Sequence, residues 1–267
     1  NNPFRNMFIS VDNTCKICEN CRLVYELEIG FWYGSMYVSY AISVGVMLLF
    51  WTLTNFFYPS KKQLNIKDYH SIKKFLKKIK PKVVIHAAAI SRPMNTHETK
   101  PQESIKTNII GTCNLVIVCK EMGIKIIYFS TNYVYPIDKR NHKETDPVLP
   151  INAYAFSKLG GECAVQMYNN SLILRISMTE KPFLYPKAYI DVISNYLYQD
   201  EVINILPKII NLKGIINIGG KIQSIYQLAK KTNPKVKKIY AKQLLRKKYF
   251  KYQTINTAKL KKILKNK

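Results

Sequence analysis

The stretch I-K-I-I-Y-F-S-T-N-Y-V-Y, residues 124–135, decides the fold of this chain. Its first half is a short apolar run that follows a predicted helix, Asn108 to Glu121. Two further runs of the same kind lie at Val83 to Ala89 and Ile173 to Ser177. Apolar runs of this length that alternate with helices are typical of a parallel sheet covered on both faces. The sequence therefore predicts an α/β fold with a Rossmann-like, doubly wound parallel sheet.

Two of these runs end in small or polar residues, Ala87 to Ala89 in one and Ser130 and Thr131 in the other. Ligands of open parallel sheets bind outside the carboxyl ends of the strands, so both sets are expected to face one crevice. Small residues at that place would let a cofactor approach the backbone.

A second block, Y-A-F-S-K, runs from Tyr154 to Lys158. In a helix its tyrosine and lysine share one face, where a phenol and an ammonium can touch the same ligand. A tyrosine with a pKa near ~10 is a poor proton donor or acceptor at neutral pH unless a neighbouring cation favours the phenolate. The spacing predicts an acid–base pair in which the lysine is that cation.

The chain resembles the extended short-chain dehydrogenase/reductase superfamily and, within it, the dTDP-4-dehydrorhamnose reductase group of sugar-nucleotide 4-keto reductases. The resemblance covers about residues 64–220. Besides the two blocks above, it rests on L-N-I-K-D (64–68), P-K-V-V-I-H-A-A-A (81–89), N-I-I-G-T-C-N-L (108–115), K-E-T-D-P-V-L-P (143–150), L-G-G-E (159–162), L-I-L-R-I-S (172–177) and G-I-I-N-I-G-G (214–220).

This resemblance implies roles for individual residues. Tyr154 would donate a proton to the substrate carbonyl, Lys158 would hold the nicotinamide ribose and stabilise the phenolate, and Thr131 would orient the carbonyl. The cofactor, NADPH or NADH, would further lie against Ala87, Ala88, Ala89, Ser91, Asn108 and Ser130. Substrate contacts would come from Asn132, Arg175 and Ser177, although Asn132 stands where the reductases usually have Asp and Arg175 could instead pair with Glu144 or Asp146.

The implied function is NAD(P)H-dependent reduction of a 4-keto-6-deoxy nucleotide sugar in nucleotide-sugar biosynthesis, or an epimerase or dehydratase relative of that reaction. The alternative is a non-catalytic or regulatory relative that has lost cofactor binding, similar to the methionine adenosyltransferase beta subunit. The implied partners are a sugar nucleotide and, as an open option, a second copy of the chain in a homodimer.

Residues 1–60 depart from the family pattern. Gly30, Gly34 and Gly45 are the only glycines before Gly111, and they do not form the fingerprint that brings a helix N-terminus to a cofactor pyrophosphate. The choice between NADH and NADPH is therefore unreadable. Between Ile29 and Ser60 the segment has no charged residue, so residues 34–58 are long enough for a membrane span.

Three readings of this segment stay open: a membrane span, a buried soluble helix, and a truncated or altered start. Lys61 and Lys62 follow it directly, so a span would leave the reductase-like part in the cytoplasm. Without a span the protein is expected in the cytoplasm. The expected division is residues 1–60 as the atypical segment, 61–180 as the Rossmann-like core, and 181–267 as a short substrate-side region with a Lys-rich tail.

The net charge is +26, but only six of the 42 basic residues are Arg. Base readout and phosphate forks favour Arg, so the composition argues against sequence-specific nucleic-acid binding. A sugar nucleotide is itself an anion and fits the charge. Cys15, Cys18 and Cys21 lack a nearby fourth ligand, so no metal site is predicted.

Overall fold

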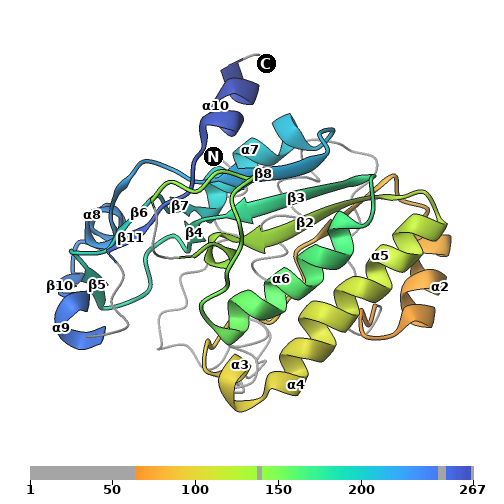
Figure 1. The fold of residues 1–267 in the computed structure, drawn as a ribbon, viewed down its shortest axis with the longest axis horizontal. Coiled ribbons are helices and arrows are strands. Elements are labelled where there is room, and N and C mark those ends of the chain that lie inside the picture. Colours follow the sequence, from red (N-terminus) through yellow and green to blue (C-terminus); the bar gives the residue numbers. More distant parts are fainter. Residues whose placement is uncertain (1–63, 137–139, 246–250, 266–267) are drawn as a thin grey trace, which may run out of the picture. The chain divides into compact units, whose positions relative to one another are not determined.

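The computed structural model describes residues 64–136, 140–245 and 251–265, and Figure 1 shows their arrangement. The atypical N-terminal segment, its glycines and the Cys15–Cys21 cluster lie outside these residues. In the described ranges, no helix combines the length and the apolar character that crossing a bilayer requires.

A four-stranded parallel sheet lies at the centre, in the spatial order β1-β2-β3-β8. Val84 of β1 pairs with Ile126 of β2, and Ile173 of β3 pairs with Ile215 of β8. The strands are β1 (Val83–His86), β2 (Lys125–Thr131), β3 (Ser171–Ile176) and β8 (Gly214–Ile218). The α/β fold class and all three apolar runs are thereby confirmed as parallel strands.

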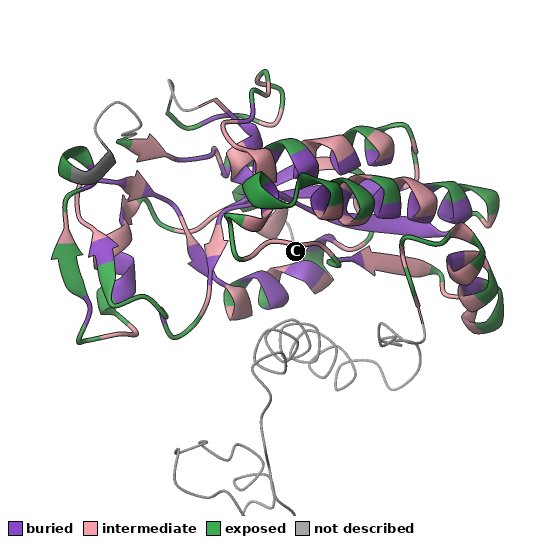
Figure 2. Cartoon of the chain, turned by 90° about the horizontal axis from the view of Figure 1, so that it is seen from below, coloured by how far each residue is buried: buried purple, intermediate pink, exposed green. Residues whose placement is uncertain are grey.

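Three helices cover one face of this sheet (Figures 1 and 2). They are α2 (Tyr69–Ile79), α5 (Gly111–Glu121) and α6 (Ala153–Gln166). Ile72 of α2, Leu115 of α5 and Val165 of α6 share a buried cluster with Ile126 and Tyr128 of β2. Ile127 alternates with these strand residues and is also fully buried, so both faces of the sheet are covered.

Side chains at the helix N-termini explain where α2 and α6 begin. Asp68 accepts a hydrogen bond from the backbone N–H of His70, and Asn152 accepts one from the N–H of Ala155 at 2.8 Å. These oxygens satisfy amide groups that have no partner inside the helix. The cap at Asn152 fixes the position of Tyr154, two residues further on.

The helix predicted from Asn108 divides in the structure. A π-helical turn, η1 (Ile105–Ile110), precedes α5, and two short helices, α3 (Thr96–Thr99) and α4 (Pro101–Ser104), precede η1. Such π-helical turns occur mostly as insertions inside α-helices and often lie at functional sites. Asn108 is buried within this turn.

The polypeptide after β3 forms short strands and helices beside the carboxyl end of the sheet. Strand β5 pairs with β10, β6 pairs with β9 and β11, and β4 pairs with β7. These elements are β4 (Met178–Thr179), β5 (Lys187–Tyr189), β6 (Ile193–Ser194), β7 (Leu197–Tyr198), α7 (Gln199–Ile209), β9 (Gln223–Ser224), α8 (Ile225–Lys230), β10 (Lys237–Ile239), α9 (Ala241–Leu245), β11 (Tyr252–Gln253) and α10 (Ala258–Lys265). Earlier in the chain, the 3-10 turn η2 (Asn132–Val134) directly follows β2.

Candidate active site

Tyr154 and Thr131 meet at the carboxyl end of the sheet. Tyr154 lies in the first turn of α6 and Thr131 is the last residue of β2, and the Thr131 hydroxyl lies near enough to the phenol to affect its pKa. Burial raises the pKa of Tyr154 to about 12, while the Thr131 hydroxyl and the charge of Arg92 act in the opposite direction. The phenol therefore keeps its proton at neutral pH, as a proton donor must.

Lys158 lies one turn further along α6 and is only 3% exposed. Its Nζ sits 4.2 Å from the centroid of the Tyr128 ring, and it makes no hydrogen bond within the described part of the chain. Burial lowers the pKa of Lys158 to about 7, although the charge of Glu162 works against this shift. An ammonium without a protein acceptor leaves its hydrogen-bonding positions to water or to a ligand.

These pKa values correct the electrostatics expected from the Tyr154–Lys158 spacing. The sequence predicted that the lysine would lower the pKa of the phenol, yet the pKa of Tyr154 is raised. The cation that opposes the rise is Arg92. The reason is burial, which raises the pKa of the phenol and lowers that of the ammonium, so each group favours its neutral form.

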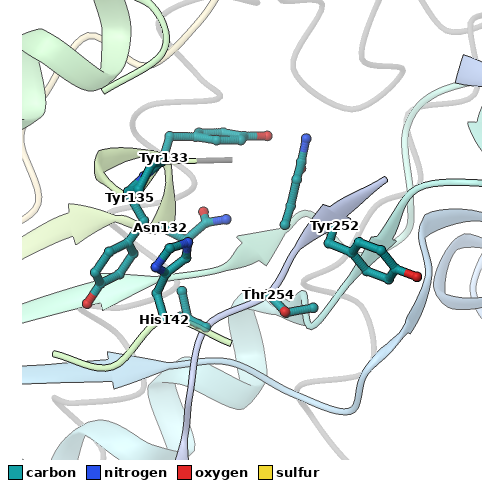
Figure 3. Close-up of a pocket in the computed structure, with 9 residues that line it drawn as sticks. Asn132, Tyr133, Tyr135, His142, Tyr252 and Thr254 are labelled. Carbon is teal, nitrogen blue, oxygen red and sulfur yellow. The ribbon is translucent and has the colours of Figure 1, made fainter. Parts of the chain in front are cut away.

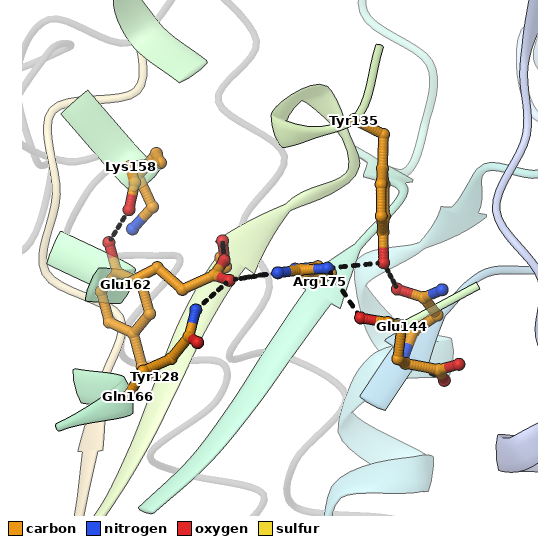
Figure 4. A network of polar contacts seen from close by, with 9 residues as sticks. Tyr128, Tyr135, Glu144, Lys158, Glu162, Gln166 and Arg175 are labelled. Carbon is orange, nitrogen blue, oxygen red and sulfur yellow. Dashed lines mark hydrogen bonds and ion pairs between the residues drawn. The ribbon is translucent and has the colours of Figure 1, made fainter. Parts of the chain in front are cut away.

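Glu162 is the centre of a buried polar network one turn beyond Lys158 (Figure 4). Its carboxylate accepts hydrogen bonds from Nε and Nη2 of Arg175 at 3.0 and 2.6 Å. It also accepts one from Ser130 Oγ at 2.5 Å and one from Gln166 Nε2 at 3.1 Å. Ser130, a predicted cofactor contact, thus has its hydroxyl committed to this network.

Arg175 extends the network away from α6 (Figure 4). Its Nη1 donates to the Tyr135 hydroxyl at 2.8 Å and to the backbone carbonyl of Glu144 at 3.2 Å. Arg175 is 3% exposed, so the structure gives it a structural ion pair in place of the predicted substrate contact. Its carboxylate partner is Glu162, whereas the sequence pointed to Glu144 or Asp146.

Asn108 joins three parts of the site. Its amide donates to the carbonyl of Ile90 and to Ser157 Oγ, both at 2.9 Å, and its Oδ1 accepts from the N–H of Ile90 at 2.7 Å. It therefore fixes the loop after β1 to helix α6. These bonds occupy both polar atoms of its side chain. The cofactor contact predicted for Asn108 remains a prediction.

The loop after β1 carries the other predicted cofactor residues. Ala87 and Ala88 are exposed, and Ala89 and Ser91 are partly buried. Exposed alanines directly after a buried strand leave the backbone open to a ligand. The contacts predicted for these four residues remain predictions.

The two remaining predicted substrate residues lie in different surroundings. Asn132 lines a small pocket with Tyr133, Tyr135, His142 and residues 252–255 (Figure 3). Ser177 is fully buried, and its backbone bonds to Ile218 and Leu197. Ser177 therefore holds strands together and does not line this pocket.

The contacts that several residues make near Tyr154 are not indicated by the sequence, even where the residue itself, as Tyr133 does, lies in a quoted block. The Tyr133 ring lies 6.4 Å from the Tyr154 ring, and its hydroxyl is 2.6 Å from that of Tyr196. Arg92 pairs with Glu180 and lies over the Tyr185 ring. These contacts join residues far apart in the chain, so no local pattern could reveal them. Within the described ranges, no cluster of His, Cys, Asp and Glu could hold a metal ion.

Residues 49–206 match the family model of the RmlD substrate binding domain. The chain belongs to this family. Methionine adenosyltransferase 2 subunit beta from Xenopus laevis is 33% identical over 119 residues, which cover 44% of this chain and 35% of that protein. A dTDP-4-keto-6-deoxy-D-glucose reductase from Streptomyces niveus is 29% identical over 107 residues, 40% of this chain and 37% of that protein. The chain thus spans little more than a third of these relatives.

Solved structures confirm the extended short-chain reductase fold. The dTDP-4-dehydrorhamnose reductase of Bacillus anthracis, solved with NADP, has a TM-score of 0.67 and 23% identity, with 76% of this chain and 82% of that chain covered. The Clostridium acetobutylicum dTDP-4-dehydrorhamnose reductase has a TM-score of 0.64 and 24% identity, with 78% and 87% covered. The fold predicted from the resemblance is therefore correct.

Proposed function

We propose that this chain reduces the keto group of a 4-keto-6-deoxy nucleotide sugar with a nicotinamide cofactor. The observation that carries the proposal is the protonated phenol of Tyr154, which lies near the Thr131 hydroxyl at the carboxyl end of the sheet. A ketone that receives hydride needs a proton donor and an orienting hydroxyl at its oxygen, and this pair supplies both. Family membership and the Streptomyces reductase support the substrate class.

The described residues fit the nicotinamide half of such a cofactor. The buried Lys158 ammonium makes no hydrogen bond within the described residues, and ribose hydroxyls would supply acceptors for it. Ala87 and Ala88, directly after β1, are exposed. The cofactor, when bound, supplies the hydride. Structural relatives solved with NADP and with NAD support either form of the cofactor.

The chain's own groups then handle the proton. Tyr154 gives its hydroxyl proton to the carbonyl oxygen as the alkoxide develops, and Thr131 donates a hydrogen bond to the same oxygen. The resulting phenolate is stabilised by the nearby positive charge of Arg92. Lys158, with a pKa of about 7, holds a proton in about half of the molecules at neutral pH.

A non-catalytic role is the alternative, favoured by the match to methionine adenosyltransferase 2 subunit beta. Two assays on the whole chain separate these functions. The first measures thermal shift and fluorescence with NADPH and with NADH, and the second measures nicotinamide oxidation with dTDP-4-keto-6-deoxyglucose. The reductase proposal predicts binding of one cofactor and turnover. Binding without turnover of any keto sugar would favour the non-catalytic role, and no binding would exclude the reductase.

A further inference from the structure

A histidine that no motif singles out packs against Tyr154. His97 lies in α3, is 1% exposed, and has its ring centroid 5.1 Å from that of Tyr154 at an interplanar angle of 57°. Its Nδ1 is 2.7 Å from Ser104 Oγ in α4. The imidazole ring therefore packs at a tilt beside the phenol ring, and a hydroxyl fixes its orientation.

The same short helix also contacts the helix that carries Tyr154. Glu98 Oε1 accepts a hydrogen bond from the N–H of Ala153, the first residue of α6, at 3.4 Å. The turn that carries Tyr154 is thus held through its backbone by Glu98 and through its aromatic ring by His97. Both contacts come from α3, which follows the loop of predicted cofactor residues.

The charge state of His97 suits a packing role. Burial lowers the pKa of His97, and the Ser91 backbone and the Glu98 charge only partly oppose that shift. The ring is therefore neutral at neutral pH. Its Nε2 is buried and has no hydrogen-bond partner with good geometry within the described residues, so hydrogen bonding alone does not explain why the side chain is buried there.

We propose that His97 is a positioning residue for Tyr154: its imidazole, anchored by Ser104, fixes the phenol ring and keeps water from it. This rests on the proposed function only for its catalytic consequence. The positional claim concerns the free protein. Tyr154 is partly buried, and burial is the largest cause of its raised pKa, so further water admitted beside the ring should lower that pKa toward its ordinary value near ~10.

The direct test is an NMR titration of ring-labelled tyrosine between about pH 8 and 10.5, around the ordinary tyrosine pKa. The Tyr154 signal is assigned by its loss in Tyr154→Phe. In the wild-type chain this signal should stay constant across the range. In His97→Ala it should titrate, and in His97→Phe, which keeps a ring on the phenol, it should stay close to wild type.

Two further variants make the test decisive. Ser104→Ala removes only the anchor and should produce a smaller change in the same direction, which guards against misfolding of His97→Ala. His86→Phe is the matched control, since His86 is also buried, bonds one hydroxyl at 2.8 Å and faces the ring of Tyr128. It should leave the Tyr154 signal unchanged. The proposal would be overturned if His97→Ala and Ser104→Ala were folded and their Tyr154 signals stayed constant across the pH range, as in the wild-type chain.

Turnover supplies a second readout. His97→Ala should lower kcat about ten-fold or more, because displaced catalytic groups lose rate, with KM within about two-fold, and His97→Phe should recover most of kcat. Equal losses in His97→Ala and His97→Phe would contradict positioning by the ring. If even the wild-type chain turns over no keto sugar, the proposed reaction fails while the titration still decides the role of His97.

Discussion

Helix α6 carries two buried charges one turn apart, and their surroundings differ. The carboxylate of Glu162 receives four hydrogen bonds, from Arg175, Ser130 and Gln166. The ammonium of Lys158 receives an aromatic face and makes no hydrogen bond within the described residues. The comparison teaches that the carboxylate of Glu162 has its hydrogen bonds within the protein, whereas the Lys158 ammonium has no hydrogen-bond acceptor among the described residues, as the proposed cofactor contact requires.

The largest expected effect on stability comes from the Glu162 network. Glu162→Gln leaves the Arg175 guanidinium buried without a charged partner, so the free energy of unfolding should fall by about 3 to 5 kcal/mol. Urea unfolding at neutral pH measures it. The matched control is the double variant Glu162→Leu with Arg175→Met, which removes both charges and should recover much of the loss. A single variant as stable as wild type would show that the network contributes little.

Removing the charge of Lys158 should not lower the stability of the chain, in contrast to removing that of Glu162. In the folded chain Lys158 loses its proton near pH 7, whereas in the unfolded chain it keeps it to about 10.5. Between these values the wild-type chain gains stability with rising pH, by roughly 1.4 kcal/mol per pH unit from this group. Lys158→Met removes that slope.

The measurement is urea unfolding of both proteins at several pH values between about 7 and 9, a range within the Lys158 window. At neutral pH and below, Lys158→Met should be at least as stable as wild type. Identical pH dependence of the two proteins would show that Lys158 is not desolvated. A large loss of stability in Lys158→Met would show that the lysine, like Glu162, stabilises the fold.

Adjacent hydroxyls on β2 sharpen the comparison further. Ser130 belongs to the Glu162 network, so Ser130→Ala should cost about 1.5 kcal/mol of stability, the usual value for a hydrogen bond to a charged group. Nicotinamide cofactor affinity should change less than about two-fold, because the hydroxyl already has a partner. A large loss of affinity in a stable Ser130→Ala protein would restore the predicted cofactor contact.

Thr131 should show the reverse pattern. Thr131→Val removes the hydroxyl that lies near Tyr154 while keeping the shape of the side chain, so turnover should fall about ten-fold or more with little change in the unfolding midpoint. Thr131→Ser keeps the hydroxyl and is the control, with turnover close to wild type. Equal turnover of the valine and serine variants would show that the Thr131 hydroxyl does not contribute to the reaction.

Local patterns predicted what depends on local sequence. The apolar runs became β1, β2 and β3, and the spacing of Tyr154 and Lys158 placed both in one helix. Both results follow from short-range periodicity, which the sequence states directly. The resemblance to the family predicted that Thr131 and Tyr154 lie close together. Local periodicity could not have predicted this, because the two residues lie in different elements.

Long-range contacts and burial were not predictable in this way. Arg175 pairs with Glu162 on a neighbouring element, and His97 reaches Tyr154 across 57 positions of sequence. The pKa directions of Tyr154 and Lys158 depend on how deeply each is buried, which a spacing rule does not give. The short helices that carry His97 have weak periodic signals, so their packing became visible only in the structure.

The most direct test of the role proposed for Tyr154 is the turnover of Tyr154→Phe, measured with dTDP-4-keto-6-deoxyglucose and with whichever nicotinamide cofactor binds. The substitution removes one hydroxyl and leaves the ring packed against His97 and Tyr133. The account predicts that kcat falls by about a hundred-fold or more while cofactor affinity and stability stay near wild type. Wild-type turnover by Tyr154→Phe would contradict it.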